Sequence, residues 1–272
     1  MTPAITPELR ERAGKDRPLA VLDLFSGIGG FSLGLERTGG FKTVAFCEIE
    51  PFCRRVLAKH WPEVPNLGDV SAAEFPEADV ITAGFPCQDI SSAGNRSDRA
   101  GLSGARSGLF WQVVRAIRLV RPRLVLLENV AALLDRGMGV VLGALAEIGH
   151  DAEWDCIPAA AVGAPCIRDR LFVAAYPHGT GRRGLKERNL FAETGITPPR
   201  RRHVDGLDLA EAGPWSACPD VLRVDYGLPG TVDRLRAAGN AIVPKIAELI
   251  GRAILANIDA PPATPLATGE AA

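Results

Sequence analysis

Short apolar runs rich in β-branched residues alternate along this chain with stretches of helical periodicity. The runs are LAVLDLF (19–25), TVAFCE (43–48), DVITAGF (79–85), RLVLLENV (123–130) and RLFVAAY (170–176), and each has the length of a buried strand. Between them, FSLGLERT, PFCRRVLAKHW, FWQVVRAIRLV and GVVLGALAEIG carry apolar residues three and four positions apart, as amphipathic helices do. Strands that alternate with helices favour a mostly parallel sheet covered on both faces. The sequence therefore predicts a doubly wound α/β domain.

The alternating pattern ends after Tyr176 and divides the chain into parts. Residues 177–230 are rich in Gly, Pro and Arg, which indicates a small irregular region, and helical periodicity returns in the last part of 231–258. A polar N-terminal extension (1–17) and a Pro- and Ala-rich tail (259–272), predicted to be disordered, flank the rest. We expect one main domain formed by 18–176 plus 231–258, with 177–230 inserted.

Composition excludes several classes of protein. The chain has 272 residues, 47% of them hydrophobic, so it can bury a sizeable core and is not predominantly disordered. The longest uncharged stretches, 24–35 and 156–167, are shorter than the roughly 18 apolar residues that a membrane span needs. The polar N-terminus has no apolar signal core, which favours the cytoplasm. Six scattered cysteines without a C-x-x-C pair predict neither a disulfide framework nor a metal site.

Positive charge is concentrated in two segments although the net charge is only −1. Residues 96–123 contain seven Arg and one acid, and residues 182–203 contain seven Lys or Arg and two acids. Such segments suit the phosphates of a nucleic acid, but charge alone is equally consistent with two solvated surfaces.

A glycine-rich turn and two acidic residues indicate a nucleoside ligand. The first strand ends in Asp23-Leu-Phe-Ser-Gly-Ile-Gly-Gly30, and glycines at a strand-to-helix turn let a ligand approach the backbone. Ser32 occupies the place of the third glycine of a dinucleotide motif, which favours a smaller ligand. Glu48, after the second strand, could accept hydrogen bonds from ribose hydroxyls, and Asp69 could accept one from an adenine amine. Each feature alone is more simply a tight turn or a solvated acid; in this order they predict a cofactor site.

Reactive side chains follow three further strands. Cys87 comes directly after Pro86 at the end of a strand, where a nucleophile would face the ligand crevice, although free cysteines are more often buried in the core. The polar segment QDISSAGNRSDRAGLSGARSG that follows is long enough to be a functional loop, and its arginines could reach DNA. Glu128 ends an apolar strand that can raise its pKa, although it could equally cap a helix. Arg168 and Arg170 alternate on one face of a strand and could clamp a base oxygen or a phosphate.

The segments DLFSGIGGFSLGLE, GFPCQDIS and ENV, the R-x-R pair and GNAIVP, in this order, resemble the motif series of the DNA cytosine carbon-5 methyltransferases. The resemblance covers roughly 19–176 and 231–250. It implies a Rossmann-like catalytic domain that uses S-adenosyl-L-methionine, with 177–230 as a small target-recognition region. By the same resemblance, the cofactor site is formed by Phe25, Ser26, Gly27, Gly29, Gly30, Glu48, Ile49, Asp69, Val70, Pro86, Leu109, Asn240 and Ala241.

The resemblance also implies a reaction. Cys87 as thiolate would add to carbon 6 of a cytosine flipped out of double-stranded DNA, and Glu128 would protonate or hydrogen-bond ring nitrogen 3. Arg170 would hold the base oxygen, while Arg168 would position the backbone or the active-site loop. The residues expected to contact DNA are Gln88, Ser91, Arg96, Arg99, Arg106, Arg200, Arg201 and Arg202.

Some features depart from the family pattern. Cys166 stands where the family usually has Gln, and RVDYGLPGTVDRLRAAGN replaces the usual segment before the last motif. The recognition region of about fifty residues predicts a short DNA site. We expect a monomer, encoded by a bacterium or phage, that acts alone or beside a restriction endonuclease for the same site. Two alternatives stay open, a tRNA cytosine carbon-5 methyltransferase of the same fold and a catalytically silent DNA-binding relative. Thymidylate-synthase-like chemistry leaves the glycine turn and Glu48 without a function.

Overall fold

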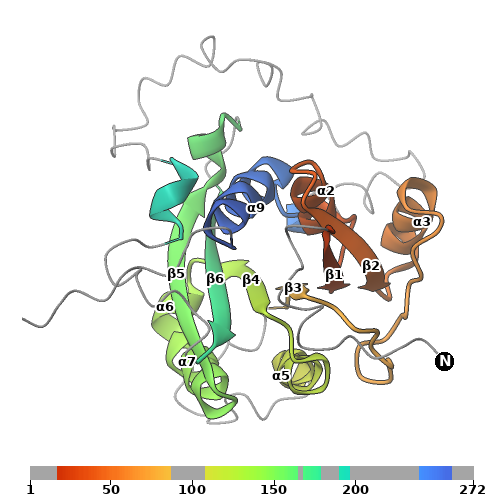
Figure 1. Ribbon diagram of the computed structural model, residues 1–272, viewed down its shortest axis with the longest axis horizontal. Coiled ribbons are helices and arrows are strands. Elements are labelled where there is room, and N and C mark those ends of the chain that lie inside the picture. The colour runs from red at the N-terminus through yellow and green to blue at the C-terminus, as the bar shows by residue number, and fades with distance from the viewer. Residues whose placement is uncertain (1–16, 87–107, 165–167, 179–189, 197–238, 259–272) are drawn as a thin grey trace, which may run out of the picture.

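The computed structural model describes residues 17–86, 108–164, 168–178, 190–196 and 239–258, which form an α/β domain around one six-stranded sheet (Figure 1). The strands lie in the order β2-β1-β3-β4-β6-β5. Their bounds are β1 Leu19–Leu24, β2 Phe41–Cys47, β3 Val80–Gly84, β4 Leu124–Val130, β5 His150–Pro158 and β6 Asp169–Pro177.

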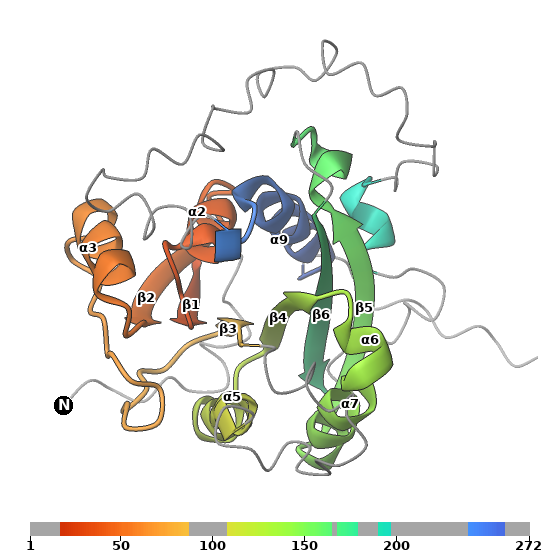
Figure 2. The ribbon, with the colours of Figure 1, turned by 180° about the vertical axis from the view of Figure 1, so that it is seen from behind.

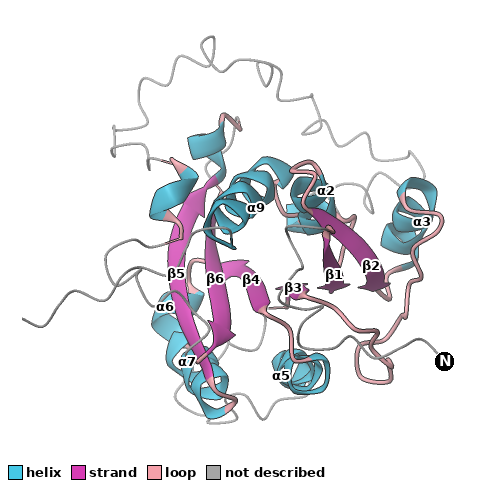
Figure 3. Cartoon of the chain, in the orientation of Figure 1, coloured by secondary structure: helices cyan, strands magenta, loops and turns pink. Residues whose placement is uncertain are grey.

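Helices cover both faces of this sheet, and Figure 3 shows the layers by secondary structure. Helices α2 and α9 lie on one face, and α5 and α7 on the other, in both views of the ribbon (Figures 1 and 2). The helix bounds are α2 Gly30–Glu36, α3 Pro51–His60, α5 Gly108–Val120, α6 Leu133–Arg136, α7 Met138–Glu147 and α9 Pro244–Ile258, with short 3-10 turns η3 Ala159–Val162 and η5 Ala192–Thr194. None of the helices described is both long and apolar enough to cross a membrane.

Five of the six strands point the same way. β1 pairs in parallel with β2 and β3, and β3 with β4, whereas β6 runs antiparallel to both β4 and β5. The predicted doubly wound, mostly parallel sheet is confirmed. The sequence prediction missed β5, because its segment HDAEWDCIP has three acidic side chains and a histidine and no apolar run.

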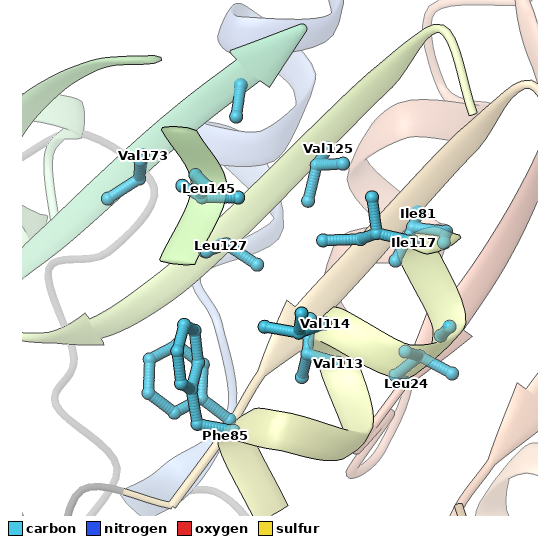
Figure 4. Packing of buried hydrophobic residues seen from close by; sticks show 14 of the residues in the cluster. Leu24, Ile81, Phe85, Val113, Val114, Ile117, Val125, Leu127, Leu145 and Val173 are labelled. Carbon is cyan, nitrogen blue, oxygen red and sulfur yellow. The ribbon is translucent and has the colours of Figure 1, made fainter. Parts of the chain in front are cut away.

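Alternate residues of the strands feed two separate hydrophobic cores. Leu24, Ile81 and Val125 face α5 and α7, and Figure 4 shows them packed with Val113 and Ile117 of α5. The opposite face of the sheet packs against α2 and α9 through a second cluster. Because both faces are covered, the ends of the strands are where polar groups of the sheet can meet a ligand.

The C-terminal segment returns to the first helix at very close range. A Cβ on Gly30 would lie 2.5 Å from the carbonyl oxygen of Ile242, and one on Gly34 would overlap the carbonyl oxygen of Pro244. Only glycine allows this approach of two backbones. Residues 239–243 are thereby held against the start of α2, beside the glycine-rich turn.

Part of the predicted inserted region packs on the main domain. Leu190 and Phe191 are buried in the same core as α9, and the backbone N–H of Leu190 donates to Glu153 Oε2 at 2.8 Å. Residues 190–196 are therefore integral to the domain core. The rest of 177–230, apart from Pro177 and His178 at the end of β6, lies outside the described residues, as do 1–16 and 259–272.

Candidate active site

The carboxyl ends of β1, β3 and β4 meet at one edge of the sheet, because these strands are parallel. Gly84, the last residue of β3, is directly opposite Glu128 in the strand register. A Cβ on Gly84 would lie 3.5 Å from Glu128 Oε2, so glycine leaves room beside the carboxylate. Cys87 follows three residues after Gly84 and lies outside the described residues; Pro86, immediately before it, is exposed.

Glu128 is a buried carboxyl group in contact with an arginine. It is 7% exposed, and its Oε1 lies 2.9 Å from Nε of Arg170. Burial raises the pKa of Glu128, and the positive charges of Arg170 and Arg168 oppose that rise. Both arginines of the R-x-R pair thus act on one carboxyl group, although Arg168 precedes β6 and only Arg170 is within the strand. A carboxyl group whose pKa is raised keeps its proton to a higher pH than an exposed one, which suits it to act as a proton donor.

Asn129 joins the end of β4 to the segment that leads to Cys87. Its Nδ2 donates to the carbonyl oxygen of Phe85 at 3.0 Å, and its Oδ1 accepts from the N–H of Val130 at 2.8 Å. The side chain is 4% exposed, so both bonds are shielded from water. Sequence reasoning did not give Asn129 a function, because its partner is 44 positions away.

The turn after β1 adopts left-handed backbone at three positions. Phe25, Gly27 and Gly29 have φ values of 54°, 55° and 83°. The N–H of Gly27 donates to Glu48 Oε2 at 2.7 Å, and the N–H of Glu50 donates to Glu48 Oε1 at 2.7 Å. Glu48 was predicted only as a ribose acceptor, but its carboxylate also fixes the shape of this turn.

The glycines of the turn serve different purposes. Around Gly27 no atom lies within 4 Å of the position of a Cβ, so space is open there for a ligand. A Cβ on Gly29 would lie 2.7 Å from the ring of Trp61, and a Cβ on Gly30 would lie 2.5 Å from the carbonyl oxygen of Ile242. At Gly29 and Gly30 the missing side chain therefore makes room for protein atoms. Contacts from their main chain to a cofactor stay a prediction.

The other predicted cofactor residues differ in their exposure. Ile49 is 67% exposed, which is unusual for a large apolar side chain, and it adjoins Glu48. Asp69 is exposed, and its Oδ1 accepts from the N–H and hydroxyl of Ser71 at 2.8 and 2.7 Å, which lowers its pKa. The side chain of Val70 packs in the core, so only its main chain is available to a ligand. Asn240 is exposed, and Leu109 and Ala241 are half-buried.

These features fit an adenosine-containing cofactor. The open space beside Gly27 lies next to a carboxylate suited to hydroxyl donors, and an exposed apolar side chain offers a surface for a flat ring. Ser26 contributes to the turn itself, because its hydroxyl is 2.6 Å from the carbonyl oxygen of Asp23 and the residue is 7% exposed.

A buried carboxyl group beneath the turn was missed by the sequence analysis. Asp23 is 1% exposed and accepts hydrogen bonds from Ser32 Oγ at 2.8 Å and Thr82 Oγ1 at 2.6 Å. Burial raises the pKa of Asp23 to about 7, although the two hydroxyls oppose that rise. Ser32, which departs from the dinucleotide motif, thus has a structural function: it links α2 to β1 and, through Asp23, to β3.

The first basic segment is divided by the fold. Helix α5 lies between β3 and β4 in the chain, and these strands are parallel, so it leads from the edge where β3 ends to the opposite edge, where β4 begins. Arg118, Arg121 and Arg123 therefore lie toward the far edge, and Arg115 donates to backbone carbonyls. The arginines of this segment that were predicted to contact DNA precede α5 in the sequence. The predicted DNA-contacting residues Gln88, Ser91, Arg96, Arg99, Arg106, Arg200, Arg201 and Arg202 all lie outside the described residues.

The fold and these groups define an α/β domain with a nucleoside-type site beside a buried Glu–Arg pair and the strand that leads to a cysteine. Residues 19–199 match the model of the family described as C-5 cytosine-specific DNA methylase. The chain belongs to this family.

Named relatives agree with this assignment. The chain is 37% identical over 166 residues to Type II methyltransferase M2.BsuMI of Bacillus subtilis, covering 58% of this chain and 42% of that protein. It is 36% identical over 180 residues to Type II methyltransferase M.Sau3AI of Staphylococcus aureus, covering 58% and 43%. The chain thus spans less than half the length of these relatives. The crystal structure of a Spodoptera frugiperda DNMT2 mutant shares the fold, with a TM-score of 0.50 at 22% identity over 60% of this chain and 51% of that one.

Proposed function

We propose that this protein transfers a methyl group from S-adenosyl-L-methionine to carbon 5 of cytosine in double-stranded DNA. The observation that carries the proposal is the buried Glu128–Arg170 pair, which lies opposite Gly84 in a member of this family. Gly84-Phe85-Pro86 leads directly to Cys87 in the sequence, and we propose that this cysteine is the nucleophile that acts together with Glu128. A protein that only binds DNA has no need of either group.

The residues at the glycine turn would hold the cofactor. S-adenosyl-L-methionine, when bound, supplies a methyl group activated by its sulfonium. Glu48 would accept hydrogen bonds from the ribose hydroxyls with lone pairs that the N–H groups of Gly27 and Glu50 leave available. Asp69 would accept from the adenine amine through the carboxylate oxygen not bonded to Ser71, and Ile49 would cover the ring. The other predicted cofactor residues would complete the site: Phe25, Ser26, Gly29, Gly30, Val70, Pro86, Leu109, Asn240 and Ala241.

Cys87 and Glu128 would activate the base together. The Cys87 thiolate forms a bond to carbon 6 of cytosine, and the electron pair of the 5,6 double bond moves toward carbon 5. Glu128 donates a proton or hydrogen bond to ring nitrogen 3, which neutralises the charge that develops there. The methyl group would pass to carbon 5 and S-adenosylhomocysteine would leave. A base would then remove the carbon 5 proton, the electron pair of that bond would re-form the 5,6 double bond, and Cys87 would leave as thiolate while any proton on nitrogen 3 returns to Glu128. Arg170 holds the base oxygen while it pairs with Glu128, and Arg168 positions the neighbouring backbone or loop.

The target base must leave the duplex to reach these groups. Gln88, Ser91 and Arg106 would close the gap from the loop between β3 and α5, and Arg96, Arg99 and Arg200–Arg202 would contact DNA. Because the named relatives are Type II methyltransferases, we propose that a restriction endonuclease recognises the same site.

Transfer of labelled methyl groups to plasmid DNA and, in parallel, to tRNA tests the proposal. Wild-type protein should label DNA, and Cys87→Ala should not. Cys156→Ala is the matched control, because Cys156 is half-buried on β5, which β6 separates from β4. Glu128→Gln should lose about 10²–10⁴ of the rate, as expected for loss of a general acid. Labelling of tRNA alone would assign the protein to RNA; labelling of neither substrate, or equal labelling by Cys87→Ala, would refute the proposal.

A further inference from the structure

The segment that carries Asp69 has no helix or strand between α3 and β3 in the part of the chain that the structure describes. Its shape therefore depends on contacts with other elements. Within it, Asp69 and Ser71 form a small hydrogen-bonded turn at the surface. Just beyond, Ala73 is buried and Phe75 is half-buried, both against the core that α5 completes.

Arg115 of α5, which lies 45 positions after Val70 in the chain, holds this segment in place. Its Nη2 lies 2.6 Å from the carbonyl oxygen of Val70 and 3.3 Å from that of Ala73. Its guanidinium carbon lies 4.8 Å from the centre of the Phe75 ring. Nε is held by Gln112 Oε1 at 2.9 Å, so the orientation of the guanidinium is fixed from its own helix.

These contacts are made to residues that overlap or directly follow the acidic turn in the sequence. Val70, whose carbonyl Arg115 contacts at 2.6 Å, is the residue directly after Asp69. A planar guanidinium can bond two carbonyls and stack on a ring at once, whereas an ammonium group presents no such plane. Charge-assisted hydrogen bonds to two carbonyls of one irregular segment restrict its conformation far more than apolar packing alone.

We propose that Arg115 is a positioning residue for the cofactor, which holds the Asp69–Ser71 turn in the place where Asp69 contacts the adenine amine. The inference rests on the proposed function, because it assigns the acidic turn to the cofactor site. α5 is the first described element after Cys87 in the chain, and it also contacts the segment that carries Asp69. Arg115 acts through Asp69 and does not itself touch the cofactor.

Calorimetric titration with S-adenosylhomocysteine, which needs no DNA and no turnover, tests this. Arg115→Lys should raise the Kd for this ligand about tenfold, the loss expected when one charge-assisted bond no longer positions a contact. kcat at saturating cofactor should change less than about twofold, because the reacting groups lie on other strands. Arg118→Lys, one turn further along α5 and exposed, is the matched control and should leave the Kd unchanged. Phe75→Leu removes the ring contact alone and should weaken binding in the same direction by a smaller factor.

The double variant distinguishes positioning from general stability. In an Asp69→Ala background, Arg115→Lys should add little further loss of affinity, because the group that it positions is gone. Equal affinity of Arg115→Lys and wild type would overturn the inference, as would full additivity with Asp69→Ala. If wild type binds no S-adenosylhomocysteine at all, the proposed function itself fails. If Arg115→Lys does not fold, the Phe75→Leu and Asp69→Ala pair decides the same question by the same criterion.

Discussion

Replacement of Gly29 by alanine separates two reasons for glycine at the turn after β1. The first is conformational, since Gly29 has φ of 83° and a side chain there costs about 1–2 kcal/mol. The second is steric: the new methyl group would lie 2.7 and 2.8 Å from two carbons of the Trp61 ring. Carbon atoms prefer a separation of about 3.5–4.0 Å, so the ring must move by about 1 Å.

That movement is opposed by the partners of Trp61. Its Nε1 donates to Glu36 Oε2 at 2.8 Å, and its ring packs on Phe46 with centroids 5.4 Å apart. Overpacking of this kind costs about 1–3 kcal/mol. Together with the backbone cost, we expect Gly29→Ala to lower the free energy of unfolding by about 2–5 kcal/mol.

Two other glycines with positive φ provide controls. Gly39, with φ of 79° and open space around its Cβ position, should lose only the conformational part, about 1–2 kcal/mol, when replaced by alanine. Gly27→Ala should cost a similar amount of stability but should also weaken cofactor binding, because its methyl group enters the open space beside Glu48.

Denaturant unfolding of the three variants measures these differences, with one shared value for the dependence of the free energy of unfolding on denaturant concentration. The destabilisation by Gly29→Ala should shrink when Trp61 is replaced by leucine, which removes the clash. The reasoning is refuted if Gly29→Ala costs no more than Gly39→Ala, or if Trp61→Leu leaves its cost unchanged.

Further outcomes follow from the groups beside the turn and β4. Asn129→Ala leaves the buried carbonyl of Phe85 without its donor at 3.0 Å. The free energy of unfolding, measured by heat or denaturant, should fall by about 1–3 kcal/mol, and the methyl-transfer rate should fall as well. Unchanged stability and rate would contradict this prediction. Asp23 has its pKa raised from 3.8 to about 7, so the native state binds more protons, and its contribution to stability is complete below about pH 4 and is lost as the pH rises through 7. Between pH 5 and pH 8 this loss should lower the free energy of unfolding of the wild type by on the order of 3 kcal/mol, and Asp23→Asn should not show it. Unfolding curves of both proteins at the two pH values measure it, and the same pH dependence in both would count against the prediction. Arg170→Gln removes a positive charge that lowers the pKa of Glu128, so the alkaline limb of kcat should move to higher pH while the maximum falls about 10²-fold; a limb that moves to lower pH would be the wrong sign.

The sequence was sufficient to predict the strands whose two faces are both buried. β1, β3 and β4 are near-continuous apolar runs, because helices cover the sheet on both sides, and their ends mark the site. β5 escaped prediction because it is an edge strand whose exposed positions, among them Asp151 and Asp155, interrupt the apolar pattern. Edge position depends on the whole topology and not on local sequence.

Contacts between distant segments were also beyond sequence reasoning. The glycine motif was recognisable in the sequence. Which of its glycines has open space beside it was not, because Trp61 and Ile242 come close to Gly29 and Gly30 only in the folded chain. Likewise, the clamp from Arg115 to the Asp69 segment joins residues 45 positions apart. The residue types are the basis of the proposed chemistry of the site, whereas the hydrogen bonds that hold these residues in place could be found only in the structure.

The covalent step by Cys87 is the centre of the proposed mechanism, and it can be trapped directly. In a DNA duplex that contains 5-fluorocytosine at the target, carbon 5 carries fluorine, which a base cannot remove as a proton, so the protein stays attached to the DNA after methyl transfer. Wild-type protein with S-adenosyl-L-methionine should give a complex that resists denaturation in detergent, and Cys87→Ala should give none. A wild-type protein that methylates an ordinary duplex yet forms no such complex, or an equal complex with Cys87→Ala, would contradict the mechanism.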